Sequence, residues 1–455
     1  MIQGCCSMFS RKIITELRNW AATDHRKPLI LRGARQVGKT TAVEMFSKDF
    51  NHYVYLNLEK YEDANIFSRN LSTEELIEAI YFFKNISGSE GRTLFFIDEI
   101  QNSPQAMAQM RYFYESAKEI HVISAGSLLE RVLEPDKPAF PVGRVQYLFM
   151  YPLTFEEFLA ATGEEKAAAY YHQIPSPEFA RPKLIKLFHK YTLVGGMPEI
   201  VERHTQKADL VSLSEVYEGL LTSFQEDVGK YARNATMAHV INHAIASAPL
   251  EAGKRVKFSG FGSSNYKSRE MGEALRTLER AMIVYLLYPS TATEPPIRPD
   301  LKKSPRLQFL DTGLINYVAG LQGFFFKTTD LHAFYQGLLA EHIVGQELLA
   351  TDLKTSRKPT FWVREKKQSN AEVDFIVQSG RYIFPVEVKA GRTGTLRSLH
   401  QFVERSNHPF AIRLWAGPLE RIEALTPNGK PYTLLNLPYF LAGKIQHYIA
   451  WLKAL

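Results

Sequence analysis

One eight-residue stretch constrains the fold of this 455-residue chain more than any other. From Gly33 to Thr40 the sequence reads GARQVGKT, a full match to the pattern GxxxxGK[ST]. It follows the apolar run Pro28–Leu31 and opens a helical pattern over Thr40–Phe46, the order of strand, loop and helix that a phosphate-binding loop needs. Glycines let the backbone N–H groups of such a loop turn toward phosphate oxygens. The stretch therefore predicts a nucleotide-binding α/β sheet.

Each residue of this Walker A loop, and the one after it, is a candidate nucleotide contact. The set is Gly33, Ala34, Arg35, Gln36, Val37, Gly38, Lys39, Thr40 and Thr41. Lys39 is expected to reach the β- and γ-phosphates and to act in catalysis, and the Thr40 hydroxyl to ligate Mg²⁺. The expected cofactors are ATP and Mg²⁺.

A second motif supports this assignment. Asp98 and Glu99 directly follow the apolar run Leu94–Ile97, which is the Walker B arrangement. At the end of a neighbouring strand, Asp98 would hold Mg²⁺ through water, and Glu99 would orient and polarise the attacking water. Such a pair is by itself commonly a solvated strand end, but downstream of a phosphate-binding loop it favours catalysis.

Three further polar residues are candidates for the same site. Ser124 or Ser127 could hydrogen-bond the attacking water, and either could equally cap a helix. Arg144 could neutralise transition-state charge as an arginine finger in a neighbouring subunit, or could be a solvated surface arginine.

The first 150 residues alternate apolar runs with helical patterns, which is typical of a parallel sheet with crossover helices. The expected strands are Pro28–Leu31, Tyr53–Leu58, Leu94–Ile97, Val122–Ser124 and Val145–Phe149. Ser103 before Pro104 predicts one helix start, and Thr154 with Glu157 predicts a capping box at another. We assign residues 1–205 to one P-loop NTPase domain of AAA-like α/β fold with a helical extension.

Residues 206–310 are expected to form a second domain. Helical patterns over Ala208–Asn234 and Met237–Ala248 precede an amphipathic helix and two short strands, Ile283–Tyr288 and Arg306–Leu310. The apolar side of that helix carries Met271, Leu275, Leu278 and Met282. Helices followed by a hairpin resemble a winged helix-turn-helix, and a helical lid on the ATPase core fits the same pattern.

The motifs together resemble one known family. Beside the two Walker stretches, the chain carries Gly126-Ser127, Gly143-Arg144, Pro152–Phe158 and Gly195–Pro198. This set is similar to that of the prokaryotic AAA-type ATPases with a C-terminal domain of unknown function, and the resemblance covers nearly the whole chain. In that family a Gly-x-Pro turn packs near the adenine and links nucleotide state to the next domain. The resemblance therefore implies nucleotide-sensing roles for Gly196 and Pro198.

The tail, residues 311–455, continues the resemblance, which implies a restriction-endonuclease-like α/β fold here. The stretches that carry the resemblance are Phe309–Leu314, Gly337–Glu341, Glu372–Phe375 and Pro385–Lys389. The expected elements are a helix at Leu338–Leu349 and strands near Thr360–Arg364, Val373–Val377 and Ile383–Val388. Val373-Asp374 stands where the family's prototype has Pro-Asp. Glu387 and Lys389 alternate on one strand face, so that with Asp374 and Glu341 they could hold a divalent metal on a scissile phosphate. An inactive DNA-binding or structural module fits the same residues.

Charge points to a partner. The formal net charge is +7, and three stretches carry the excess: Lys254–Arg276 and Thr351–Asn370 at +4 each, and Arg298–Arg306 at +3. All three are expected outside the ATPase core, where they favour contact with a DNA backbone, although solvated loop lysines fit equally.

Adjacent Cys5 and Cys6 suit neither a disulfide nor a zinc site, and the longest apolar run is too short for a bilayer. We expect a cytoplasmic protein with no membrane partner.

The sequence thus predicts a Mg²⁺-dependent ATPase that acts as a nucleotide-driven switch and associates with DNA. One alternative is a regulatory or defence protein that binds other proteins and turns over ATP slowly. Another is an ATP-dependent nuclease. A protein partner and a homo-oligomer are both compatible with these predictions.

Overall fold

The computed structural model describes residues 9–69, 71–86, 91–126, 143–206, 210–229, 232–321, 338–364, 371–389 and 396–454. The chain forms two compact units. The first comprises Met1–Tyr151, Arg280–Met282 and Asp352–Ser356; the second comprises Pro152–Glu279, Ile283–Thr351 and Arg357–Leu455. These limits do not coincide with the expected boundaries at residues 205 and 310, and the division into three domains stays a prediction. Cys5, Cys6, Ser127 and the basic residues after Arg364 in the third basic stretch lie outside the described residues.

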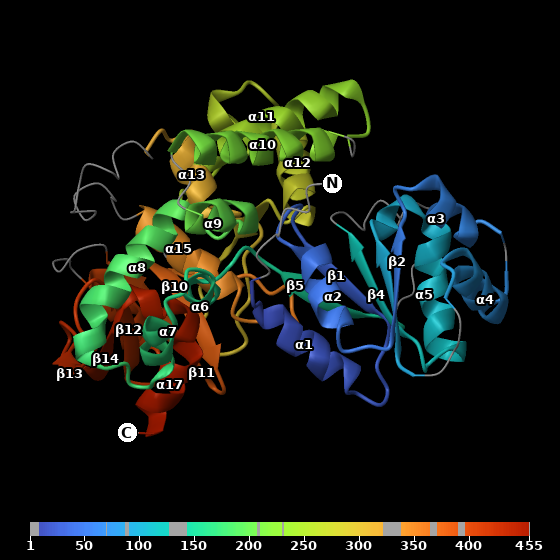
Figure 1. The fold of residues 1–455 in the computed structure, drawn as a ribbon. Helices are drawn as coiled ribbons and strands as arrows, with labels where there is room; N and C mark the ends of the chain where they lie inside the picture. Colours follow the sequence, from blue (N-terminus) through green and yellow to red (C-terminus); the bar gives the residue numbers. More distant parts are fainter. Residues whose placement is uncertain are drawn as a thin grey trace. The chain divides into compact units, whose positions relative to one another are not determined.

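The first unit is a parallel five-stranded sheet with helices on both faces (Figure 1). The strands are β1 (Leu29–Gly33), β2 (His52–Asn57), β3 (Thr93–Asp98), β4 (His121–Gly126) and β5 (Gln146–Met150). The helices are α1 (Lys12–Ala21), α2 (Lys39–Ser47), α3 (Tyr61–Phe67), α4 (Thr73–Phe83) and α5 (Pro104–Ser116). The strand order is β2-β3-β4-β1-β5, so β4 stands between the strands that carry the two Walker motifs. The expected α/β core and its five strands are confirmed.

Continuous apolar runs form the central strands because both faces of this sheet are covered. Every residue of β3 and β4 is buried. Helices α3, α4 and α5 pack on one face against a cluster that includes Ile30 and Phe95. The expected start of α5 is confirmed, since Ser103 Oγ accepts a hydrogen bond from the backbone N–H of Ala106 at 3.1 Å. The sheet and its helices thereby fix the ends of β1 and β3, where the motif residues lie.

The second unit begins with a helical region. Its helices are α6 (Phe155–Ala161), α7 (Glu165–His172), α8 (Arg181–Val194), α9 (Pro198–Thr205), α10 (Leu210–Gly229), α11 (Ala235–Glu251), α12 (Ser268–Arg280) and α13 (Thr312–Val318). The predicted capping box at Thr154 and Glu157 starts α6. Helices α10 and α11 lie side by side (Figure 1). The expected hairpin is confirmed by antiparallel pairing of β6 (Val284–Leu287) with β8 (Arg306–Phe309).

A seven-stranded mixed sheet completes the second unit, in the order β13-β14-β12-β11-β10-β9-β7. Its strands are β7 (Pro289–Ser290), β9 (Thr360–Val363), β10 (Glu372–Ser379), β11 (Tyr382–Val388), β12 (Phe410–Trp415), β13 (Glu420–Leu425) and β14 (Pro431–Pro438). Its helices are α15 (Leu338–Leu349), α16 (Arg397–Arg405) and α17 (Ile445–Ala454). The expected helix at Leu338–Leu349 and the three expected strands, which are β9, β10 and β11, are confirmed. Among the described residues no helix has the length and apolar character that a bilayer span requires.

Two expectations about the basic stretches are corrected. Part of the third stretch, Asp352–Ser356, belongs to the first unit, where Lys354 pairs with Glu16 at 2.8 Å and Leu353 O accepts from Phe149 N. That part therefore does not lie outside the unit that carries the Walker motifs. Arg306, at the end of the second stretch, is buried at 5% exposure among carboxylates and is not available to a phosphate backbone.

Candidate functional site

The loop between β1 and α2 has the backbone of a phosphate cradle. It turns through left-handed conformations at Gln36 (φ 63°) and Gly38 (φ 92°). Helix α2 then begins at Lys39 without a side-chain cap, so no capping side chain takes up its first N–H groups. A Cβ on Gly33 would lie 2.6 Å from Met150 O, which leaves room only for glycine. An uncapped helix N-terminus behind a glycine turn suits the phosphates of a nucleotide.

The polar side chains of the two Walker motifs meet beside this loop. The Thr40 hydroxyl donates to Asp98 Oδ2 at 2.9 Å, and the Tyr55 hydroxyl donates to the same oxygen at 3.3 Å. Lys39 Nζ donates to the carbonyl oxygens of Gly33 and Ala34, both at 2.9 Å. A hydroxyl and a carboxylate within one hydrogen bond of each other form an all-oxygen set of the kind that Mg²⁺ prefers. The residues present therefore fit both ATP and Mg²⁺.

Glu99 is held in an unusual conformation next to Asp98. Its backbone is left-handed (φ 52°, ψ 44°), a region that a non-glycine residue rarely adopts. Its carboxylate accepts a hydrogen bond from Gln101 Nε2. Burial raises the pKa of Glu99, although Gln101 and Lys39 act in the opposite direction. A raised pKa brings the carboxylate closer to the range in which it exchanges a proton at neutral pH.

Three residues of this site were not found from the sequence. They are Tyr55, Gln101 and Arg11. Buried Arg11 donates from Nη1 to Val37 O at 3.0 Å and from Nη2 to Tyr151 O at 2.7 Å. Arg11 thereby ties the loop to the residue after β5. Gln101 lies two positions after Glu99, and Tyr55 lies in an expected strand, so proximity to the motifs was a usable signal for these two. Arg11 precedes the loop by a whole helix and carries no such signal.

Two of the three extra candidates are described, and neither reaches the loop. Buried Ser124 lies inside β4, where its Oγ donates to Leu29 O at 3.4 Å. Arg144 Nε pairs with Glu115 Oε1 at 3.1 Å, and its guanidinium lies over the Tyr114 ring. Arg144 precedes β5, whose first residue aligns with the start of β1. It therefore lies near the N-terminal ends of these strands, whereas the loop follows the C-terminal end of β1. A role for Arg144 in a neighbouring subunit, and one for Ser127, stay predictions.

In the second unit, residues of three family motif stretches, Pro152–Phe158, Gly195–Pro198 and Phe309–Leu314, hydrogen-bond to one another. Fully buried Asp311 accepts N–H groups from Gly196 at 2.6 Å and Gly313 at 2.9 Å, and Leu153 N donates to Gly196 O at 2.7 Å. A Cβ on Gly196 would lie 2.2 Å from Leu153 O. Burial raises the pKa of Asp311 to about 6, despite the N–H donors. These contacts give the GGMP stretch a packing role, while nucleotide sensing by Gly196 and by Pro198, the first residue of α9, stays a prediction.

The expected tail residues do converge, together with two that were not expected. Glu341 on α15, Asp374 on β10 and Glu387 on β11 interact electrostatically, and Lys389 Nζ pairs with Glu387 Oε1 at 2.6 Å. Glu372, two positions before Asp374 on the same strand, and Arg306 on β8 complete the carboxylate cluster.

Arg306 stands among these carboxylates. Its guanidinium contacts Glu341 at 3.4 Å, Asp374 at 3.8 Å and Glu372. Burial, and then the neighbouring Asp374 carboxylate, raise the pKa of Glu341 to about 8 and that of Glu387 to about 7. Within the described ranges, no group of three or more His, Cys, Asp or Glu side chains is arranged to hold a metal ion. A metal role for Glu341, Asp374, Glu387 and Lys389 stays a prediction.

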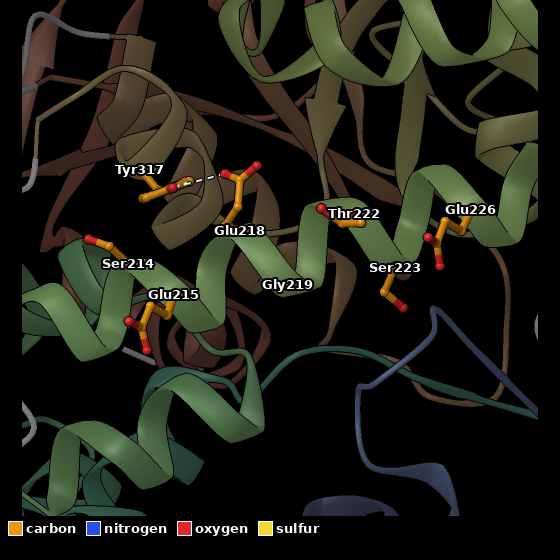
Figure 2. Close-up of a pocket in the computed structure, with 8 residues that line it drawn as sticks. All are labelled: Ser214, Glu215, Glu218, Gly219, Thr222, Ser223, Glu226 and Tyr317. Carbon is orange, nitrogen blue, oxygen red and sulfur yellow. Dashed lines mark hydrogen bonds between the residues drawn. The ribbon is translucent and has the colours of Figure 1, made fainter.

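A separate groove of about 590 Å³ runs along α10 and reaches Tyr317 on α13 (Figure 2). Tyr317 OH donates to Glu218 at 2.9 Å across it. The described lining residues include three glutamates, Glu215, Glu218 and Glu226, and no lysine or arginine. Such a lining repels phosphates, so the groove is no alternative nucleotide site.

Comparison with protein families matches an AAA domain to residues 25–159. Residues 25–159 form an AAA-type P-loop ATPase domain. Two domains of unknown function follow, DUF8612 over residues 185–324 and DUF4143 over residues 336–418. The expected ATPase core is thereby confirmed, whereas the winged-helix and restriction-endonuclease-like folds stay predictions. No curated protein matches the chain.

The solved structures that match the chain are distant from it. A Walker-type ATPase of Pyrococcus abyssi is 14% identical with a TM-score of 0.44, covering 68% of this chain and 96% of its own. A signal transduction ATPase of Pyrococcus horikoshii with a tetratricopeptide repeat sensor is 12% identical with a TM-score of 0.28, covering 75% and 48%. The Orc1 protein of Aeropyrum pernix in complex with DNA is 15% identical with a TM-score of 0.25, covering 68% and 91%.

Proposed function

We propose that this chain binds Mg²⁺·ATP in its AAA domain and hydrolyses it as a nucleotide-driven switch. The observation that carries the proposal is the contact of Thr40 Oγ1 with Asp98 Oδ2 at 2.9 Å beside an uncapped α2 N-terminus. The contact joins the N-terminal end of α2, which is expected to bind phosphate, to the Asp98 carboxylate at the end of β3. A chance motif match would not be expected to bring these two groups together.

Each group has one expected role. Backbone N–H groups of the loop and the Lys39 ammonium bind phosphate oxygens, and Thr40 and Asp98 hold Mg²⁺. When bound, Mg²⁺ neutralises charge that develops on the phosphates. Glu99 orients the attacking water and accepts its proton, a role that the raised pKa of its carboxylate favours. Gln101 is a positioning residue, because its amide donates to the Glu99 carboxylate.

The substitution Glu99→Gln tests this assignment. We expect hydrolysis to fall by about 10²-fold or more, because general-base catalysis is lost, while ATP still binds. Steady-state turnover and fluorescent-nucleotide titration measure the two effects. Glu115→Gln is the matched control, since Glu115 is exposed beside Arg144, near the N-terminal ends of β1 and β5, and should keep wild-type turnover. Wild-type hydrolysis by Glu99→Gln would remove Glu99 from the mechanism.

We propose in addition that the second unit contacts DNA through Lys254–Arg276. All six basic side chains of this stretch are exposed, and the stretch includes most of α12, which precedes the β6–β8 hairpin, the order of elements in a winged helix. Their charges suit a phosphate backbone, whose binding weakens steeply as salt rises. Among them, Lys257, Lys267 and Arg269 are the side chains best suited to charge reversal.

The triple reversal of Lys257, Lys267 and Arg269 to Glu tests this contact. We expect weaker binding to duplex DNA and a shallower dependence of the affinity on salt. The matched control reverses three exposed basic residues of the first unit, Arg18, Lys48 and Arg111. If duplex DNA neither binds nor changes ATP turnover in the wild type, the alternative of a protein-binding regulator with slow turnover replaces DNA association.

A further inference from the structure

The carboxylate cluster of the second unit already contains a cation from the chain itself. Arg306 Nη1 contacts Glu341 Oε2 at 3.4 Å and donates to the backbone oxygen of Asp374 at 3.1 Å. Nη2 pairs with Glu372 Oε1 and lies 3.8 Å from Asp374 Oδ1. One guanidinium thus meets carboxylates from α15 and β10 at once.

Aromatic rings fix the position of this guanidinium. Its central carbon lies 4.8 Å from the ring centre of Phe361 on β9 and 5.8 Å from that of Phe375 on β10. Arg306 is also a residue of β8, so its backbone is held by pairing with β6. A side chain held by strand pairing, rings and ion pairs is a permanent part of the cluster.

The cluster nevertheless contains more acidic than basic side chains. The carboxylates are Glu341, Glu372, Asp374 and Glu387, and the cations are Arg306 and Lys389. Lys389 binds only Oε1 of Glu387, and Oε2 is buried without a hydrogen-bond partner. Glu387 is 5% exposed, and its neighbours include Asp374 and Arg306. An unpaired buried carboxylate oxygen costs free energy and is a ready ligand for a hard cation.

We propose that Arg306 is the resident cation of this cluster and excludes divalent metal ions from it. In the described structure Glu341, Asp374 and Glu387 are not arranged around a metal ion; without the guanidinium they could shift toward the space it leaves and offer oxygen ligands alone to a divalent cation. The wild-type cluster is therefore a structural ion-pair network that joins β8 to α15 and to the mixed sheet, and it takes no part in metal-dependent phosphodiester cleavage. The inference is independent of the proposed ATPase activity.

The experiment measures Mn²⁺ binding to the full chain without nucleotide, by electron paramagnetic resonance of free Mn²⁺. We expect Arg306→Met to gain one site that binds Mn²⁺ at least tenfold more tightly than any site of the wild type. Arg306→Lys, which keeps a cation, should gain much less. Adding Glu387→Gln to Arg306→Met should abolish the new site, which assigns it to the cluster.

Two results would overturn the proposal. One is a folded Arg306→Met protein that gains no Mn²⁺ site. The other is Mn²⁺ binding by the wild type that Glu387→Gln alone removes, and this comparison needs no variant at Arg306. If Arg306→Met folds poorly, its melting temperature should rise with Mn²⁺, and that rise should disappear in the double variant; no rise would count against the proposal.

Discussion

The proposed nucleotide site of the first unit and the carboxylate cluster of the second contain similar side chains, but the partners that neutralise those side chains differ. In the first, Asp98 accepts hydrogen bonds from the Thr40 and Tyr55 hydroxyls, and the Lys39 ammonium donates to two backbone carbonyls. Those partners carry no net charge. In the second, the carboxylates meet a guanidinium and an ammonium.

On the two proposals above, this difference governs which of the two sites is open to a ligand. A hydrogen bond between a charged group and a neutral partner contributes about 1.5–3 kcal/mol net, and a phosphate or a metal ion of opposite charge can replace the neutral partner. Separating a buried ion pair leaves an uncompensated charge and costs about 3–5 kcal/mol. Residue types alone therefore do not identify a ligand site; the charge of their existing partners does.

The largest expected effect is on the free energy of unfolding, when Arg306 and Lys39 are each replaced by methionine. We expect Arg306→Met to lower the free energy of unfolding by about 3–5 kcal/mol, because it leaves buried carboxylates without their counter-ion. Lys39→Met should lower it less, by about 1.5–3 kcal/mol, because two of its charge-assisted hydrogen bonds go to neutral carbonyl oxygens. Urea denaturation without divalent ions, followed by tryptophan fluorescence, measures both. Equal losses would show that Arg306 and Lys39 contribute equally to the stability of the fold, and would contradict the contrast between the two sites.

The pH dependence of stability sharpens the same contrast. The Glu341 pKa, raised to about 8, lies above the value of about 4.3 for an unfolded chain, so the folded state holds its proton over a wider range. Stability gained at low pH is therefore lost as pH rises from about 5 to 8, at up to about 1.4 kcal/mol per unit for one group. Arg306 on β8, Glu372 and Asp374 on β10 and Glu387 on β11 face this carboxyl.

Glu341→Gln should flatten that slope, because the amide does not titrate. The measurement is urea denaturation at intervals between pH 5 and 8. Glu178→Gln is the matched control, since Glu178 forms an exposed surface pair with Arg181 and should leave the slope unchanged. An unchanged slope in Glu341→Gln would mean that Glu341 is ionised throughout this range.

Sequence patterns predicted the elements whose causes are local. Strand β3 is a continuous apolar run because both sheet faces are covered, and the Walker loop is a contiguous motif. The sequence therefore places Lys39, Thr40 and Asp98 where the structure brings Thr40 and Asp98 into contact, and their roles stay predictions. Strands β12, β13 and β14 were not predicted. The residues of β13 are largely exposed and half of them are charged, which leaves a weak apolar pattern, whereas β12 and β14 are largely buried.

Long-range pairing explains the other omissions. Arg306 lies in a basic stretch that is compatible with a solvated surface, yet its partner Glu372 is 66 residues away. Its burial depends on β8 lying beside β10 and α15, which no local pattern encodes. For the same reason the convergence of Asp374, Glu387 and Glu341 was predictable from strand alternation and family resemblance, but the cation between them was not.

The next effect concerns nucleotide affinity. Lys39→Met should raise the dissociation constant for ATP by about 10- to 100-fold, since a charge-assisted contact contributes about 1.5–3 kcal/mol. Lys430→Met is the matched control, because Lys430 Nζ also donates to two backbone carbonyls, those of Val403 and Ser406, both at 2.7 Å. Fluorescent-nucleotide titration should find no change for Lys430→Met. A similar loss in both variants would trace the effect to the fold and not to the loop.

The smallest effect tests whether Tyr55 supports Asp98 or competes with its ligand. The Tyr55 hydroxyl shares Asp98 Oδ2 with Thr40, and burial, with Asp98 nearby, raises the Tyr55 pKa to about 12, so it stays a donor. If the bond orients the carboxylate, Tyr55→Phe should lower kcat/KM for Mg²⁺·ATP about 2- to 10-fold. This is less than the roughly 1.5–3 kcal/mol of a hydrogen bond to a charged group, because Thr40 still donates to the same oxygen. The fall should shrink as Mg²⁺ is raised, because excess metal compensates for a poorly oriented ligand. An increase in kcat/KM would mean instead that the hydroxyl occupies the oxygen that Mg²⁺ needs, and the nucleotide site would then resemble the Arg306 cluster in holding an internal competitor.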